Sequence, residues 1–161
     1  MFRVYNIMGY EIEISYNVKI PTHYLTNVIA KTKEIADTNY CQKHFQFTQS
    51  KNPNNHNHSH SHSHSQNSNR KNEIPTVVFC FESERLTEMT TFLKEVIAKY
   101  KKKTRIESVY DVDARNIIYA SPNYVDILET SHKEDYNYRR QTRSFSETDY
   151  FILRDILKKN Y

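Results

Sequence analysis

The sequence predicts an α+β domain with one sheet of about six strands and helices packed on one face. Residues 10–20 alternate apolar and polar side chains without interruption, which indicates a strand with one buried and one solvent-facing side. Residues 86–100 repeat apolar side chains every three or four positions, as in an amphipathic helix. A sheet with one wet face needs helices only on the other. A ferredoxin-like arrangement is one of several topologies that fit.

The remaining elements of the first third follow from local signals. Residues 2–8 are strand-like, and Gly9 sits where a hairpin would turn, because glycine adopts positive φ at little cost. Thr22 is the expected N-cap of a helix that ends near Asn39. Residues 40–47 then predict a short strand.

The second half opens with residues 76–81, which are apolar on both faces and predict a central strand. Ser83 is the expected N-cap of the helix that follows. Residues 105–112 and 115–120 predict a hairpin, and Thr76 to Val112 could form a right-handed strand-helix-strand crossover.

The end of the chain predicts two more helices. Ser121 and Pro122 suit the start of a short one. Ser146 with Asp149 resembles the capping pair of a last helix that presents Leu153 and other apolar side chains.

We therefore divide the chain into three parts. Residues 1–50 form the first half of the domain, residues 51–72 form a disordered His/Ser/Asn-rich insertion, and residues 73–161 form the second half. Without the insertion, the chain has a length common for single domains.

Composition points to an AT-rich genome. The chain has one glycine, no tryptophan and 13 tyrosines, and it is rich in Asn, Lys and Ile, whose codons are AT-rich. This bias and the run "HSHSHSHS" resemble proteins of giant amoebal viruses of the mimivirus type. The resemblance covers composition only. It implies a viral, uncharacterised type of protein and no functional family.

The charge distribution and the two cysteines bear on the expected charge of the domain and on its cellular compartment. Lys51, Arg70 and Lys71 of the insertion contribute most of the net charge of +4, so the rest is nearly neutral. Cys41 and Cys80 are the only cysteines and suggest reduced intracellular thiols. With no signal peptide or membrane-spanning run in evidence, we expect a cytoplasmic protein, in a host cell or virion if viral.

The histidine tract is the most conspicuous feature. In an extended chain its alternate histidines would project to one side and could bind a divalent metal weakly. Serine and asparagine neighbours offer no scaffold that fixes such a site, so we interpret the tract as a tolerated low-complexity insertion. The histidines concerned are His56, His58, His60, His62 and His64.

Cys41 and His44 have the spacing of metal ligands, and Cys80 could approach them if their strands pair. A structural zinc site needs four ligands, so we prefer a buried thiol and a surface histidine. Asp111 and Asp113, with Arg115 nearby, could hold Mg²⁺ for phosphate chemistry. Because lone D-x-D patterns are common, we prefer to place Asp113 in the hairpin turn and Asp111 on its solvated shoulder.

The stretch from 136 to 145 interleaves aromatic and arginine side chains, a chemistry suited to stacking bases and neutralising phosphates. Acidic residues flank it on both sides, so a solvated loop is the preferred interpretation. The candidate nucleic-acid contacts are Tyr136, Tyr138, Arg139, Arg140, Arg143 and Phe145.

A single glycine excludes the usual P-loop, Rossmann fingerprint and nucleophile elbow, which need glycines for close backbone approach. We expect no catalytic residues, no cofactor and no membrane association. The leading hypothesis is a non-enzymatic intracellular protein-interaction domain with an unknown protein partner. The alternatives are a nucleic-acid-binding module that uses residues 136–145 and a Mg-dependent enzyme of phosphate chemistry.

Overall fold

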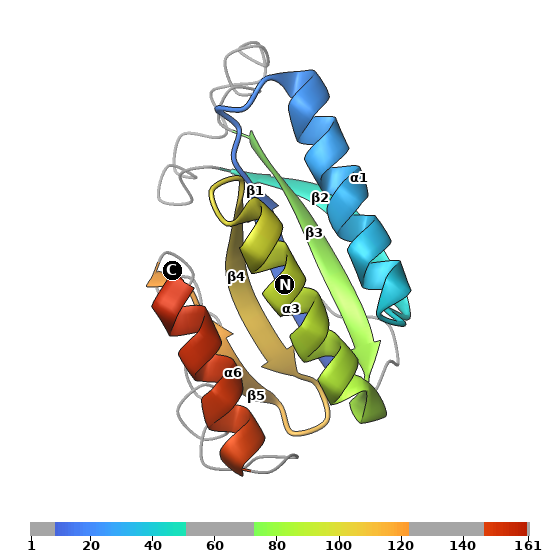
Figure 1. Ribbon diagram of the computed structural model, residues 1–161, viewed down its shortest axis with the longest axis vertical. Coiled ribbons are helices and arrows are strands. Elements are labelled where there is room, and N and C mark those ends of the chain that lie inside the picture. The colour runs from blue at the N-terminus through green and yellow to red at the C-terminus, as the bar shows by residue number, and fades with distance from the viewer. Residues whose placement is uncertain (1–8, 51–72, 123–146, 161) are drawn as a thin grey trace, which may run out of the picture.

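A five-stranded antiparallel sheet with three helices on one face forms the body of the protein (Figure 1). The computed structural model describes residues 9–50, 73–122 and 147–160. The predicted α+β class with helices on one face is confirmed, with five strands among these residues. The strands are β1 (Gly9–Tyr16), β2 (Lys43–Ser50), β3 (Glu73–Glu82), β4 (Thr104–Asp111) and β5 (Asn116–Ala120). The helical elements are α1 (Thr22–Thr38), the 3₁₀ turn η2 (Ser83–Arg85), α3 (Leu86–Tyr100) and α6 (Glu147–Asn160).

The strand order is β2-β3-β1-β4-β5, and all neighbours are antiparallel. From β1 to β4 the chain follows the β-α-β-β-α-β pattern of ferredoxin-like domains. The expected strand-helix-strand unit is present as β3, α3 and β4, with β1 inserted between the two strands. The arrangement leaves β1 in the centre and makes β2 and β5 the edges of the described sheet.

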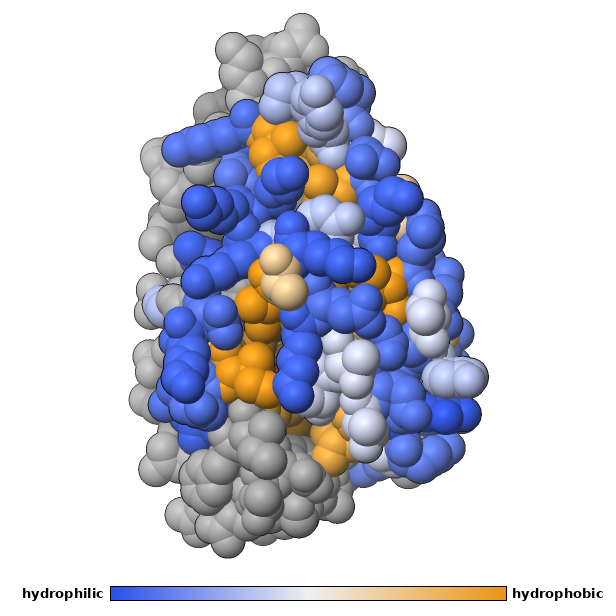
Figure 2. Space-filling view, viewed as in Figure 1, coloured by the Kyte–Doolittle hydropathy of each residue, from blue (hydrophilic) through white to orange (hydrophobic). Residues whose placement is uncertain are grey.

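The main core lies between the sheet and the helices. Figure 1 shows α1, α3 and α6 side by side in front of the strands. In the same view, Figure 2 shows hydrophilic residues over most of the helical surface, with hydrophobic residues visible in patches between them. Phe92 of α3 stacks on Phe79 and Phe81 of β3, with ring centroids 4.9 and 5.4 Å away. These aromatic contacts attach the central helix to the sheet.

Helix α1 is present as expected, and it ends at the C-cap Asn39. Its start differs. The N-cap is Pro21, with no side-chain capping hydrogen bond, and Thr22 is the first helical residue. Tyr16 at the end of β1 makes a buried 2.7 Å hydrogen bond with Thr32, which ties α1 to the central strand.

Ser83 is not the N-cap of α3. It begins η2, and its hydroxyl donates a 2.5 Å hydrogen bond to the Asp113 carboxylate in the β4–β5 loop. The Ser83 hydroxyl therefore connects η2 to the β4–β5 loop instead of capping a helix. Helix α3 begins three residues later at Leu86, and its apolar stripe is buried as predicted.

Strand β1 differs from the sequence-based prediction in two ways. It ends at Tyr16 rather than residue 20, because Asn17 begins a turn in which its side chain accepts from the backbone N–H of Lys19. Its polar side chains are also buried, with Glu11 and Glu13 only 3% and 4% exposed. Alternation separates the two faces of a strand, but it does not reveal whether the second face is covered.

Gly9 is the first residue of β1 and pairs with Glu82, so the expectation of a hairpin turn at Gly9 is wrong. Its φ is 139°, and a Cβ at this position would collide with the backbone carbonyl of Phe81. The glycine is needed for close strand approach and for its unusual φ. The strand expected at residues 2–8 lies outside the described residues.

The hairpin of β4 and β5 is confirmed, with Arg115 at a φ of 51° in its loop. The last helix is present as α6, with Leu153 and Leu157 buried against the core. The expected cap Ser146 and most of the short helix expected after Pro122 fall outside the described residues.

Candidate protein-interaction edge

Two of the sequence-based candidates lie outside the residues that the structure describes. These are the histidine tract, His56 to His64, and the interleaved aromatic and arginine residues from Tyr136 to Phe145. Both remain predictions from sequence.

Asp111 and Asp113 are directed to different local partners. Asp111 is buried at the end of β4, and its Oδ1 accepts a 3.2 Å hydrogen bond from the backbone N–H of Ala114. Asp113 accepts from the Ser83 hydroxyl instead. The first carboxylate shapes the hairpin turn and the second joins that turn to η2. Asp113 therefore lies in the hairpin turn as expected, but the expectation of a solvated Asp111 is wrong, because this residue is only 1% exposed.

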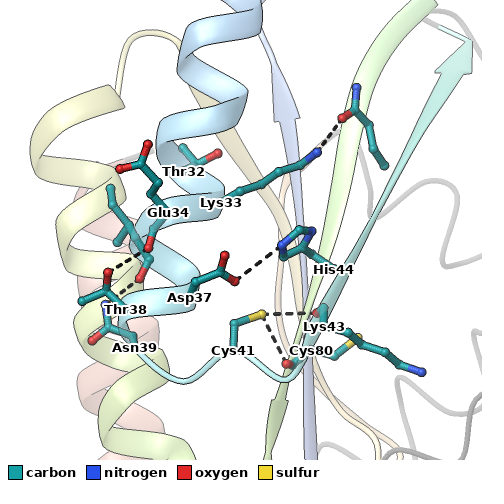
Figure 3. Close-up of polar contacts among 12 residues, drawn as sticks. Thr32, Lys33, Glu34, Asp37, Thr38, Asn39, Cys41, Lys43, His44 and Cys80 are labelled. Atoms are coloured by element: carbon teal, nitrogen blue, oxygen red, sulfur yellow. Dashed lines mark hydrogen bonds and ion pairs between the residues drawn. The ribbon is translucent and has the colours of Figure 1, made fainter.

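Cys41 lies just before β2, His44 lies in β2 and Cys80 lies in the paired strand β3, but their side chains have different surroundings. Figure 3 shows the Cys41 thiol facing backbone carbonyls, with Sγ 3.2 Å from the Lys43 oxygen and 3.4 Å from the Cys80 oxygen. His44 faces Asp37 of α1, with 3.5 Å between Nε2 and Oδ1. The Cys80 side chain packs with Val78 in a cluster apart from the main core.

The Cys41 thiol is a poor candidate nucleophile. Its pKa is raised from 9.0 to about 12, chiefly by burial and also by the nearby Asp37 charge, while the two carbonyl contacts act in the opposite direction. A thiol with a raised pKa is protonated near neutral pH, whereas the thiolate is the reactive form. Neither cysteine forms a disulfide.

Across the described ranges, no group of three or more His, Cys, Asp or Glu side chains is placed to hold a metal ion. Within the same ranges, no helix combines the length and apolar character needed to cross a membrane.

A buried carboxylate on β4 was missed in the sequence. Glu107 accepts hydrogen bonds of 2.6 Å from the hydroxyls of Ser15 on β1 and Ser121 after β5. The backbone N–H of Ser121 also donates to the Glu107 carbonyl at 2.8 Å. Glu107 on β4 thus joins the residue after β5 to β1 across β4. The sequence does not indicate that Ser15 and Ser121 share a hydrogen-bond partner, because the two residues come close only in the folded sheet.

The outer side of β2 is the candidate interaction surface in the described fold. Residues 43–50 pair with β3 over eight consecutive positions without a register shift. Their other side is an edge of the described sheet. The strand contains no proline, and Lys43 is its only lysine. Prolines, bulges and lysines are the usual features that prevent an edge from pairing with another chain.

Aromatic side chains lie along this edge. Phe45 is 37% exposed, and the Lys43 Nζ lies 5.2 Å from its ring centroid. Phe47 shares a face of the strand with Phe45 and packs against Val78 and Cys80. The edge strand therefore carries exposed and half-buried aromatic area.

A second exposed aromatic lies just before β2. Tyr40 is 60% exposed and has a φ of 63°, in the left-handed region that a non-glycine residue rarely adopts. The Arg85 guanidinium lies 4.4 Å from its ring centroid, and Arg85 also pairs with Glu88. This contact joins η2 to the segment that leads into the edge strand.

Comparison with protein-family models, with curated proteins and with solved structures finds no match to this chain.

Proposed function

We propose that this protein is a non-enzymatic interaction domain that binds another protein by adding a strand to the β2 edge. The observation that carries the proposal is the eight-residue, unshifted pairing of β2 with β3 at an edge of the described sheet. Backbone hydrogen bonds would supply affinity in this mode, and alternate side chains would supply specificity.

The side chains of β2 support this mode of binding. Phe45 and Phe47 offer aromatic area on one face of the strand, where a partner's side chains would lie beside them. Large aromatic side chains are enriched at protein interfaces because they bury much apolar area with few rotatable bonds.

We also propose an intracellular, cytoplasmic location. The support is chemical. Cys41 and Cys80 are both thiols in a fold where their side chains occupy different surroundings, which suits a reducing compartment.

The test is comparative capture from a cell lysate, in which the full chain is set beside Phe45→Lys. A lysine in an edge strand discourages strand addition, because pairing would bury or crowd its charge. The matched control is Tyr24→Lys, which replaces a 57% exposed aromatic on α1, away from the edge. Circular dichroism would first establish that all three proteins are folded.

The proposal expects one or more proteins that bind the full chain and Tyr24→Lys but are lost with Phe45→Lys. A nuclease-treated arm separates the alternative function. Retention that disappears with nuclease, and that is equal for the three proteins, would contradict the proposal and favour nucleic-acid binding. Identical capture by all three after nuclease would also contradict it.

A further inference from the structure

We propose that the end of the sheet where β1 finishes and β4 begins binds the phosphate backbone of nucleic acid. Exposed basic side chains from three segments of the chain gather there, and we call them the basic end. This inference is independent of the β2 edge. The residues of the basic end are Lys19, Lys101, Lys102, Lys103 and Arg105, and all five are exposed.

Backbone contacts bring the three segments together. The turn between α3 and β4 holds the three consecutive lysines, and the Lys103 carbonyl accepts a 3.0 Å hydrogen bond from the Asn17 N–H. The Asn17 side chain in turn accepts a 2.9 Å hydrogen bond from the N–H of Lys19. Arg105 pairs with Ser15 near the same end of the β1–β4 ladder. Figure 1 shows the turn after α3 beside the chain that leads from β1 into α1.

The segments that meet at the basic end contain no negative charge. Residues 15–24 and 96–106 include neither Asp nor Glu. Within the described part of the chain, no carboxylate forms an ion pair with any of the five basic residues, whereas Lys99 on α3 does pair with Glu95. The next acid along β4 is Glu107, which is buried and accepts hydrogen bonds from two serines instead. The positive charge of this end is therefore available to a ligand.

The stability of α3 does not account for this cluster. A basic residue at the C-terminal end of a helix interacts favourably with the helix dipole. However, the Tyr100 carbonyl in the last turn already accepts hydrogen bonds from the Lys103 N–H, at 2.9 Å, and from the Thr104 hydroxyl, at 2.8 Å. Lys19 and Arg105 belong to other elements, so the dipole of α3 does not explain why they lie at the same end.

The opposite end of the same strands has the opposite charge. Glu82 pairs with Gly9 at the start of β1, and residues 82–88 contain three glutamates and one arginine. A domain with a small net charge can therefore still present one strongly positive end. Such an asymmetric charge distribution orients a polyanion toward the positive end and raises its rate of association.

Nucleic acid suits this surface better than a membrane does. Peripheral membrane segments usually combine basic side chains with apolar side chains that enter the lipid. In the described ranges, no exposed Leu, Ile, Met or Val side chain accompanies the basic end. A nucleic acid needs only closely spaced cations, because its phosphates repeat about every 3.4 Å along each strand. Contacts to phosphates position a protein without reading bases, so we expect binding that does not depend on base sequence.

Fluorescence anisotropy with a short fluorescein-labelled DNA duplex of mixed sequence tests the inference. The full chain should bind with a Kd of about 1–100 μM at physiological salt, and its affinity should fall steeply as salt rises. The test variant changes one residue in each segment, as Lys19→Gln, Lys102→Gln and Arg105→Gln together. The matched control removes two lysines and one arginine from exposed positions elsewhere, as Lys31→Gln, Lys94→Gln and Arg115→Gln together.

The slope of log affinity against log salt is the decisive measurement. Each phosphate contact contributes about 0.9 to this slope, so the test variant should lower it by about 2.7 and weaken binding about tenfold or more. The control should keep the slope of the full chain. Circular dichroism would first establish that both variants are folded.

Three results would overturn the inference. The first is no DNA binding by the full chain, and the second is an equal loss in the test variant and the control. The third is a loss confined to a variant in which Arg139, Arg140 and Arg143 are replaced by Gln, which would place the contact in residues 136–145. Sedimentation with phosphatidylserine vesicles but no DNA binding is a form of the first result, and it would assign the basic end to a membrane.

This inference and the β2 edge can fail separately. Phe45→Lys should not weaken DNA binding, and the test variant should still capture, after nuclease treatment, the proteins that bind β2. Loss of DNA binding in the test variant with no edge-dependent capture would leave only the basic end standing. Edge-dependent capture without DNA binding would leave only the strand-addition function.

Discussion

The two edges of the described sheet are built in opposite ways. Strand β5 has five residues, its pairing with β4 contains a register shift between Val109 and Tyr110, and most of it is buried. Helix α6 contacts this edge. Strand β2 has eight residues in unshifted pairing, and it carries exposed Phe45. Short, irregular and covered edges resist pairing with other chains, whereas long and regular edges favour it.

The two ends of the sheet are therefore expected to have different roles. The β5 end packs against the core. Near it, the Glu107 carboxylate accepts hydrogen bonds from Ser15 and Ser121. The β2 end is attached to α1 by exposed or half-buried polar contacts, including the one between Lys33 and Gln46. We therefore expect substitutions at the β5 end to lower stability, and substitutions at the β2 end to change association.

The largest expected effect is on a core residue of β5. Ile118 is 2% exposed, so Ile118→Ala should lower the free energy of unfolding by about 3 kcal/mol, through lost burial and a residual cavity. Phe45→Ala on β2 should cost less than about 1 kcal/mol, because Phe45 remains partly in water. Urea denaturation measures both. Equal losses in the free energy of unfolding for Ile118→Ala and Phe45→Ala would contradict the expected difference between the two edges.

Glu107→Ala comes next. It deprives two buried hydroxyls of their acceptor, and we expect a loss of about 2 kcal/mol. Glu107→Gln should lose less, because one amide oxygen can still accept. Glu34→Ala removes an exposed carboxylate on α1 and should cost under about 0.5 kcal/mol. Thermal or urea unfolding of the three variants gives the order, and a neutral Glu107→Ala would show that the carboxylate does not fasten β5.

The third effect depends on pH. Burial raises the pKa of Cys41 to about 12, so its neutral thiol stabilises the folded state fully below its ordinary pKa of 9.0. That contribution should diminish as the pH rises from 9.0 toward about 12, because the unfolded chain ionises first. Cys41→Ala removes this titration. Urea denaturation across the range should therefore show a steeper loss for the natural chain than for Cys41→Ala, and parallel pH profiles would contradict the prediction.

The smallest expected effect is at the contact between α1 and β2. The Lys33 Nζ donates a 2.8 Å hydrogen bond to the Gln46 Oε1 at an exposed site. Lys33→Met should change the free energy of unfolding by less than about 0.5 kcal/mol, because water replaces an exposed hydrogen bond readily. A loss above about 1 kcal/mol would mean that the β2 edge is held more firmly than its exposed contacts indicate.

Local periodicity was enough to predict most of the fold. The apolar spacing of α1 and α3, the buried run of β3 and the β4–β5 hairpin all follow from side-chain patterns within single elements. Errors arose where a residue's role depends on distant neighbours. Ser83 hydrogen bonds to Asp113 instead of capping a helix, and Glu11 is buried although its strand alternates like one with a wet face.

The candidate site was harder to predict for the same reason. Residues 43–50 give a strand signal, but whether a strand is central or at an edge is a property of the whole sheet. The spacing of Cys41 and His44 suggested a metal site, and only the fold shows that one faces backbone carbonyls and the other faces Asp37. Motif spacing identifies residue types, while the pairing of strands decides which side chains share a face.

The most direct test of the central contrast is hydrogen–deuterium exchange of the two edges, with and without a protein captured through β2. Strand addition should increase the amide protection of residues 43–50, and that of residues 116–120 should stay constant. Protection of β2 that does not change on binding, or that changes equally at both edges, would contradict the account.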